Sequence, residues 1–236
     1  MLSPSRHLQF LKITSWMILA MVLIIPIQVI IFMVSPMPET TVSWVELFSN
    51  QPLMGLLHMD LLYIINNSLL IFFYIALYMT LKKSSPSLNL IALTTGLIGA
   101  VLYYTSNRSI EMLMLSQRFF LETDPAMISA NLALAESYLD IWKGTSFTIY
   151  YILSAISLIL FSITILEDSF YSRKTGIWGL ISGILMIIPS NVGMIGLVMS
   201  LLSLIPWIVF SILVLMRLFR IDERELMDNQ LNSDSV

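Results

Sequence analysis

The chain has 236 residues, of which 57% are hydrophobic and only 11% are charged. A soluble globular protein carries about 25% charged residues, so these charges are too few to cover a water-facing surface, and the composition excludes that class. The net charge of −3 gives no sign of a basic patch that would bind a nucleic acid. The chain has no cysteine, which excludes disulfides and thiolate sites, and only two histidines, which excludes a multi-histidine metal site. We therefore expect a membrane protein with no nucleic-acid partner, no metal and no cofactor.

Six apolar stretches follow one another along the chain, and a helix needs about 20 such residues to cross the hydrocarbon core of a bilayer. They occupy residues 12–34, 53–81, 88–105, 146–166, 175–190 and 194–217. The fifth is short and ends at Pro189-Ser190-Asn191, which are turn formers. The fifth and sixth stretches therefore form a tight hairpin, with a re-entrant fifth segment as the alternative. The pattern predicts an all-α polytopic membrane helix bundle with six transmembrane helices in a single domain over 1–220.

Lysine and arginine orient this bundle. Nine of them fall at the N-terminus, in the loops 82–87 and 167–174 and from Arg217 onward, whereas the other side holds three, namely Arg108, Arg118 and Lys143. The positive-inside rule places both termini in the cytoplasm, and six crossings likewise require both termini to lie on one side of the membrane. The tail 221–236 holds five acids, one arginine and few apolar residues. We expect it to be a disordered acidic cytoplasmic tail.

The segment 106–144 between spans three and four is too long for a turn and too apolar for disorder. Asp124-Pro125 is a helix start and Lys143-Gly144 a helix stop, which predicts an extracytoplasmic amphipathic helix between them. Its polar stripe is narrow and consists of Ser129, Glu136, Asp140 and Lys143, and apolar residues fill most of the remaining arc. We expect such a helix to be mostly buried, either against the outer end of the bundle or at the membrane interface.

Polar side chains interrupt the second apolar stretch, and polar groups in a transmembrane helix are a default hypothesis for a site. At 100° per residue, Asp60, Tyr63 and Asn67 share one face with Tyr74 and Tyr78, whereas His58 lies almost opposite Asp60 and Asn66 about 100° from Asn67. The alternative is architectural: asparagine amides bond across packed membrane helices, and His58 and Asp60 mark an interfacial helix start.

More polar residues lie in the outer segment. If its helix folds back over the bundle, Glu111, Glu136 and Asp140 could face Asp60 across a shallow outward pocket, where carboxylates could bind a hard cation or do acid–base work. They could equally form plain ion pairs with the outer basic residues. The sequence has no phosphate-loop, dinucleotide or zinc-protease motif, so we assign no catalytic or metal residue. The candidate ligand-binding residues are Asp60, Tyr63, Asn67, Asn107, Glu111, Glu136 and Asp140.

The chain resembles a family of small six-span prokaryotic integral membrane proteins that is grouped as a domain of unknown function. The resemblance covers about residues 53–219. It rests on Asp60 to Asn67, Ala76-Leu77-Tyr78 before Lys82-Lys83, Ser106-Asn107 with Glu111-Met112-Leu113 and Ser116, Gly144-Thr145, and Ile205-Pro206-Trp207 with Arg217-Leu218-Phe219. It implies six spans in a prokaryotic cytoplasmic (inner) membrane, and it supplies no activity, substrate or cofactor.

Three functions are compatible with these features. The first is a non-enzymatic accessory, sensing or assembly subunit that works by helix–helix association with partner subunits or a second copy in the lipid bilayer. The alternative is a small transporter or channel with an outward-facing polar site around Asp60 and Asn67. A lipid-directed intramembrane enzyme ranks last, because its acid and base would have to come from carboxylates alone.

Overall fold

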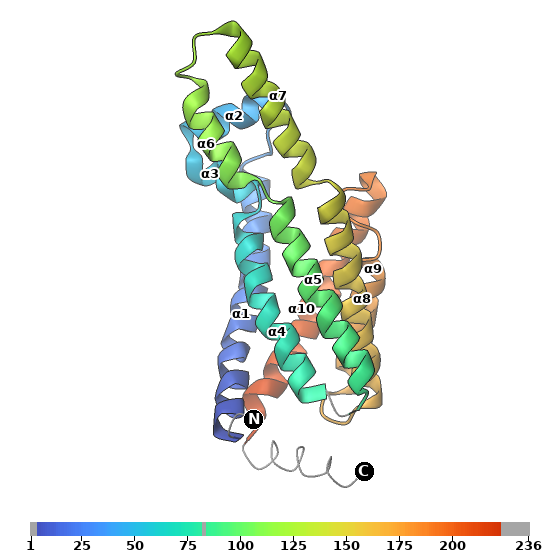
Figure 1. Cartoon of the computed structure of the whole chain (residues 1–236). Helices are drawn as coiled ribbons and strands as arrows, with labels where there is room; N and C mark the ends of the chain where they lie inside the picture. The colour runs from blue at the N-terminus through green and yellow to red at the C-terminus, as the bar shows by residue number, and fades with distance from the viewer. Residues whose placement is uncertain (1–3, 82–83, 223–236) are drawn as a thin grey trace. The chain divides into compact units, whose positions relative to one another are not determined.

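The computed structural model of the chain describes residues 4–81 and 84–222, and every regular element in these ranges is an α-helix (Figure 1). The predicted tail from residue 223 onward and the Lys82-Lys83 pair lie outside the described residues. The helices are α1 (Pro4–Val34), α2 (Thr41–Asn50), α3 (Pro52–His58), α4 (Leu61–Leu81), α5 (Pro86–Ser106), α6 (Ser109–Phe119), α7 (Pro125–Trp142), α8 (Thr145–Glu167), α9 (Arg173–Leu185) and α10 (Gly193–Arg220).

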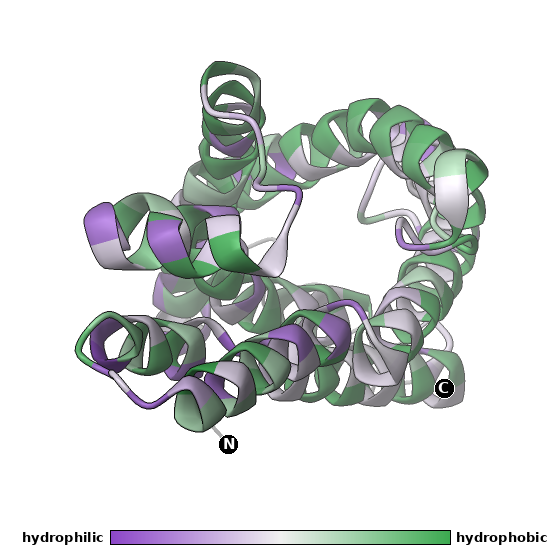
Figure 2. Cartoon of the chain, turned by 90° about the horizontal axis from the view of Figure 1, so that it is seen from above, coloured by the Kyte–Doolittle hydropathy of each residue, from purple (hydrophilic) through white to green (hydrophobic). Residues whose placement is uncertain are grey.

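The described chain has the helices of a membrane protein. Five helical runs are long and apolar enough to cross a bilayer, and most of the ribbon in Figure 2 carries the hydrophobic colour. These runs are Ser5–Val34, Leu61–Leu81, Pro86–Phe119, Pro125–Glu167 and Gly193–Arg220. The predicted fifth span, 175–190, corresponds to α9, which has only 13 residues. Helix length therefore does not confirm a sixth crossing.

Four predicted spans agree with the observed helices α1, α5, α8 and α10 to within a few residues, apart from the earlier start of α1 at Pro4. The predicted ends of the outer helix are confirmed as well. The carboxylate of Asp124 accepts a hydrogen bond from the Ala126 backbone N–H at 3.0 Å and caps α7, and Pro125 is its first residue. Gly144 follows the end of α7, where a Cβ would lie 2.9 Å from the Asp140 carbonyl oxygen.

The prediction of one unbroken helix over 53–81 is wrong, because the chain turns at Met59 and Asp60 between α3 and α4. Asp60 has a positive φ of 69°, which no residue in a right-handed helix adopts. The helical wheel that placed Asp60 on the face of Tyr63 and Asn67 therefore does not apply to Asp60. Two helices, α2 and α6, lie in segments for which no helix was predicted.

Contacts between Cα atoms divide the chain into two compact units. Unit 1 comprises 1–23, 68–100 and 151–236, and unit 2 comprises 24–67 and 101–150. In unit 1 the helices approach closely at glycines: a Cβ on Gly96 would lie 2.7 Å from the Tyr74 ring, and one on Gly179 would lie 2.1 Å from the Ser162 hydroxyl. The small residues in these helices therefore serve packing, as in other membrane bundles. The predicted single domain over 1–220 stays a prediction.

Unit 2 contains the short helices. The helix α2 packs against α3, α6 and α7, and these four helices gather together in Figure 1. Thr40 caps α2 by accepting the Ser43 N–H at 3.1 Å. The core of unit 2 consists of Trp44, Val45, Phe48, Met59, Met112, Leu115, Ala135 and Trp142.

Protein contacts bury only a small part of α7 within the described chain, and its expected burial at the membrane interface stays a prediction. Only Ala135 and Trp142 of this helix are buried, and large apolar side chains such as Met127 and Leu134 are 49% and 43% exposed. The helix touches its neighbours along a narrow strip and leaves the rest of its apolar arc uncovered.

Candidate functional site

The turn between α3 and α4 is the point where the polar residues of unit 2 converge. The helix α3 ends at His58 and α4 begins at Leu61, so that Met59 and Asp60 make the turn. Among the described non-glycine residues, a positive φ is found at Asp60 alone. Aspartate tolerates this left-handed conformation better than most residues, but a non-glycine residue there marks strain that is frequently tied to function.

His58 ties the turn to the segment after α1. Its Nε2 lies 2.7 Å from the Ser35 carbonyl oxygen, and its Nδ1 lies 2.9 Å from the carbonyl oxygen of Met54, one helical turn earlier. A carbonyl oxygen only accepts, so both contacts are hydrogen bonds only when both ring nitrogens carry a proton, and the neutral ring makes one of the two. The ring is fully buried beside Trp44, with centroids 6.5 Å apart.

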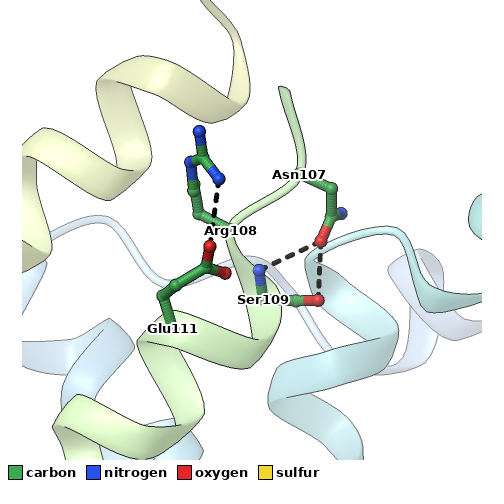
Figure 3. A network of polar contacts seen from close by, with 4 residues as sticks. All are labelled: Asn107, Arg108, Ser109 and Glu111. Atoms are coloured by element: carbon green, nitrogen blue, oxygen red, sulfur yellow. Dashed lines mark hydrogen bonds and ion pairs between the residues drawn. The ribbon is translucent and has the colours of Figure 1, made fainter. Parts of the chain in front are cut away.

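Met59 connects the turn to the link between α5 and α6. The Asn107 side-chain nitrogen donates to the Met59 carbonyl oxygen at 2.7 Å. The Asn107 side-chain oxygen accepts from the backbone N–H of Ser109 at 3.0 Å and from its hydroxyl at 2.6 Å (Figure 3). One asparagine therefore satisfies both the Met59 carbonyl at the turn and the first backbone N–H of α6, groups that a helix end leaves without partners.

Asp60 connects the turn to the end of α7. The Trp142 indole N–H donates to the Asp60 carboxylate at 2.7 Å, and both side chains are buried. The Trp142 ring packs edge-on against Trp44 at 5.5 Å between centroids, and the Lys143 ammonium lies 4.6 Å from the Trp142 ring centre. The carboxylate therefore lies at the edge of the Trp142 ring, and the Lys143 ammonium lies over the face of the same ring.

Burial raises the pKa of Asp60 from 3.8 to about 6, against the opposing effects of the Trp142 hydrogen bond and the charge of Lys143. Asp60 lies immediately before the apolar helix Leu61–Leu81. An isolated carboxylate loses hydration on burial, and one indole donor replaces only part of it. Asp60 consequently titrates near pH 6.

The asparagines on α4 have a different setting from Asp60. The Asn67 side-chain nitrogen donates to the Tyr63 carbonyl oxygen on its own helix at 2.9 Å. The side-chain oxygens of Asn66 and Asn67 are buried and have no hydrogen-bond partner among the described residues. Tyr63 is half-buried and is not without a partner.

The three outer carboxylates do not join Asp60 in direct contact. Glu111 forms an ion pair with Arg108 at 3.0 Å, the plain pairing that was the alternative to a ligand site (Figure 3). Glu136 and Asp140 are exposed on α7. Asp140 lines an open hollow of about 350 Å³ at the joint of α7 and α8, with Ser137, Ile141, Gly144, Thr145 and Ser146.

Sequence reasoning missed the partners at the turn, namely Trp142, Trp44, Ser35 and Met59. Two of these are backbone carbonyl groups, which no side-chain pattern reveals. Trp142 offered a signal, since a buried indole N–H requires an acceptor and few acceptors exist in so apolar a chain. Within 4–81 and 84–222, no group of three or more His, Asp or Glu side chains could hold a metal ion.

Comparison with known proteins identifies one family. A family model described as a domain of unknown function (DUF4386) matches residues 10–220. No curated protein and no solved structure matches the chain.

Proposed function

This chain belongs to the DUF4386 family, and from that premise we propose that it is a non-enzymatic membrane protein that works by association, as an accessory, sensing or assembly subunit. In this proposal unit 2 presents the surface for a partner subunit or a second copy.

The observation that carries the proposal is that the candidate site residues form hydrogen bonds and ion pairs with other groups of the protein itself. Asp60 accepts from Trp142, Asn107 bonds to Met59 and Ser109, Asn67 to its own helix, and Glu111 to Arg108. Each of these bonds positions one backbone segment or helix of unit 2. Polar residues that serve architecture favour a structural subunit over a transporter or an enzyme.

The helices α6 and α7 supply the surface for association. At 1.5 Å per residue, α5 with 21 residues and α8 with 23 are each long enough to cross a hydrocarbon core of about 30 Å. The helices α6 and α7 are therefore not needed for crossing, yet Met114 is 51% exposed and Leu121, in the turn between them, is 83% exposed. Exposed apolar side chains outside the hydrocarbon favour a partner.

The proposal includes a topology of six crossings with both termini in the cytoplasm of a prokaryote. The helix α9 with the following residues up to α10 would form the fifth crossing, shorter than the others. The excess of lysine and arginine at the N-terminus, in the 82–87 and 167–174 loops and from Arg217 onward supports this orientation.

Copurification tests association. The chain is purified in mild detergent, and its mass is measured together with that of any stoichiometric companion. We expect a complex or an oligomer that is lost when Leu121→Ser and Met114→Ser are combined, and retained in a matched variant of the polar stripe, Ser129→Ala. A monomer without a stoichiometric companion would contradict the proposal.

One observation favours a transporter or channel as the second candidate. The buried side-chain oxygens of Asn66 and Asn67 have no partner among the described residues, and such acceptors could meet water or a cation. Liposome flux measured with Asn67→Leu and Asp60→Asn decides between the two functions. Flux that both variants reduce would favour transport, and unchanged or absent flux removes it.

A further inference from the structure

We propose that the Asp60–Trp142 contact is a proton-operated latch: the protonated carboxyl keeps the end of α7 docked on the turn between α3 and α4, and the ionised carboxylate loosens it. This device goes beyond the proposed association and does not depend on it.

The geometry gives the ionised carboxylate too few donors. A carboxylate can accept about four hydrogen bonds, and within the described residues Asp60 receives one, from the Trp142 indole at 2.7 Å. A neutral carboxyl loses less hydration when buried, so the docked arrangement favours the protonated form. By linkage, a state that binds the proton more tightly is itself stabilised by the proton.

The charged and titratable groups around Asp60 come from several elements. Lys143, over the Trp142 ring, is the nearby cation and favours the ionised form. Tyr103 on α5 lies within electrostatic range of Asp60, and the phenols of Tyr63, Tyr104 and Tyr150 surround Tyr103. His58 directs its ring toward Ser35 and Met54 instead. The Trp142 hydrogen bond and the charge of Lys143 both favour the ionised form, and burial outweighs them, raising the pKa of Asp60 to about 6.

The end of α7 lies at a short joint, which is where the latch would release it. Trp142 is the last residue of the helix, and Lys143-Gly144 links it to α8. The joint borders the open hollow lined by Asp140 and Thr145, so the end of α7 has unfilled space beside it. When the indole leaves Asp60, the carboxylate regains water, and the backbone at residue 60 no longer needs its left-handed conformation to hold the contact.

Indole N–H resonances test the latch directly. The chain has five tryptophans, and the Trp142 resonance in ¹⁵N-labelled protein in nanodiscs is assigned by its loss in Trp142→Phe. We expect that resonance to titrate with a midpoint near pH 6 in the parent protein and to stop titrating in Asp60→Asn. The matched control is Asp140→Asn, an exposed carboxylate two residues from Trp142, which should leave the titration intact.

Movement of α7 is measured separately. Spin labels are placed on exposed Glu46→Cys of α2 and Ser137→Cys of α7 in this cysteine-free chain. We expect a broader distance distribution at pH 8 than at pH 5, and no such difference in Asp60→Asn. A Trp142 resonance that is constant between pH 5 and pH 8, or equal distance distributions at both pH values, overturns the proposal. If Asp60→Asn does not fold, the distances in the parent protein still decide.

Discussion

At the residue scale, Asp60 is the side chain whose environment is least favourable to it. It is buried, has a positive φ, and receives one hydrogen bond within the described chain. A position shaped only for stability would suit asparagine better, because an amide carries no charge and asparagine is enriched in the left-handed region. Asp60 therefore makes the folded protein less stable than an asparagine at the same position would make it.

We predict that Asp60→Asn stabilises the protein above pH 7. The folded-state pKa of about 6 exceeds the unfolded value of 3.8, so the folded state binds more protons between these values. The free energy of unfolding therefore falls as the pH rises from about 4 to above 6, by roughly 3 kcal/mol in total. Asparagine removes this loss and still accepts from Trp142.

The measurement is the unfolding midpoint in detergent from pH 4 to pH 8, compared between the parent protein and Asp60→Asn. The difference between the two proteins should grow with pH, whereas Asp140→Asn should follow the parent throughout. An Asp60→Asn protein that is less stable than the parent at pH 8 would contradict the raised pKa of Asp60.

At the element scale, sequence patterns predict most of the long helices and fail where the chain leaves the regular pattern. The spans 88–105, 146–166 and 194–217 agree with α5, α8 and α10, because hydrophobic length is the dominant signal in a membrane helix. The break at Met59-Asp60 was not predicted, because apolar residues continue on both sides of it. The partners that stabilise the break, Ser35, Asn107 and Trp142, come from distant parts of the chain.

The short helices were missed for the same physical reason. Trp44, Val45 and Phe48 of α2 have the spacing of a buried helical face, but ten residues make a marginal helix on their own. Packing against α3, α6 and α7 stabilises α2, and that packing is tertiary information. Likewise, the sequence identified the site residues as polar side chains within apolar segments. Their hydrogen-bond partners depend on how distant segments of the chain pack together.

We predict that Gly55→Ala disrupts the packing of α3 on α2. A Cβ at residue 55 would lie 2.7 to 2.9 Å from the Phe48 ring, which is fully buried. Overpacking of this kind costs about 1–3 kcal/mol of unfolding free energy. Thermal unfolding in detergent measures the loss, and Phe48→Leu added to Gly55→Ala should restore part of it. Equal stability of Gly55→Ala and the parent would show that α2 is not held against α3.

At the scale of the whole molecule, the number of crossings depends on α9. Its 13 residues span about 20 Å, less than a hydrocarbon core. Exposed Ile177, Ile181 and Ile184 give it the surface of a helix in lipid. For α9 to cross, the remaining length has to come from the residues between α9 and α10.

We predict that Val192 and Ser172 lie on opposite sides of the membrane. The chain has no cysteine, so single Val192→Cys and Ser172→Cys variants report without background. An impermeant maleimide should label Val192→Cys in intact cells and Ser172→Cys only after permeabilisation, with the exposed Ser129→Cys as the outside reference. Labelling of both positions in the same state would mean that α9 does not cross.

The central claim, that the protein works by association through unit 2, is tested most directly by photo-crosslinking in native membranes. A photoreactive residue replaces Leu121, 83% exposed between α6 and α7, or the exposed Ser129 on the polar stripe of α7. The account predicts one discrete crosslinked protein from position 121 and little from position 129. Lipid adducts alone at position 121, with no protein crosslinked from either position, would contradict it.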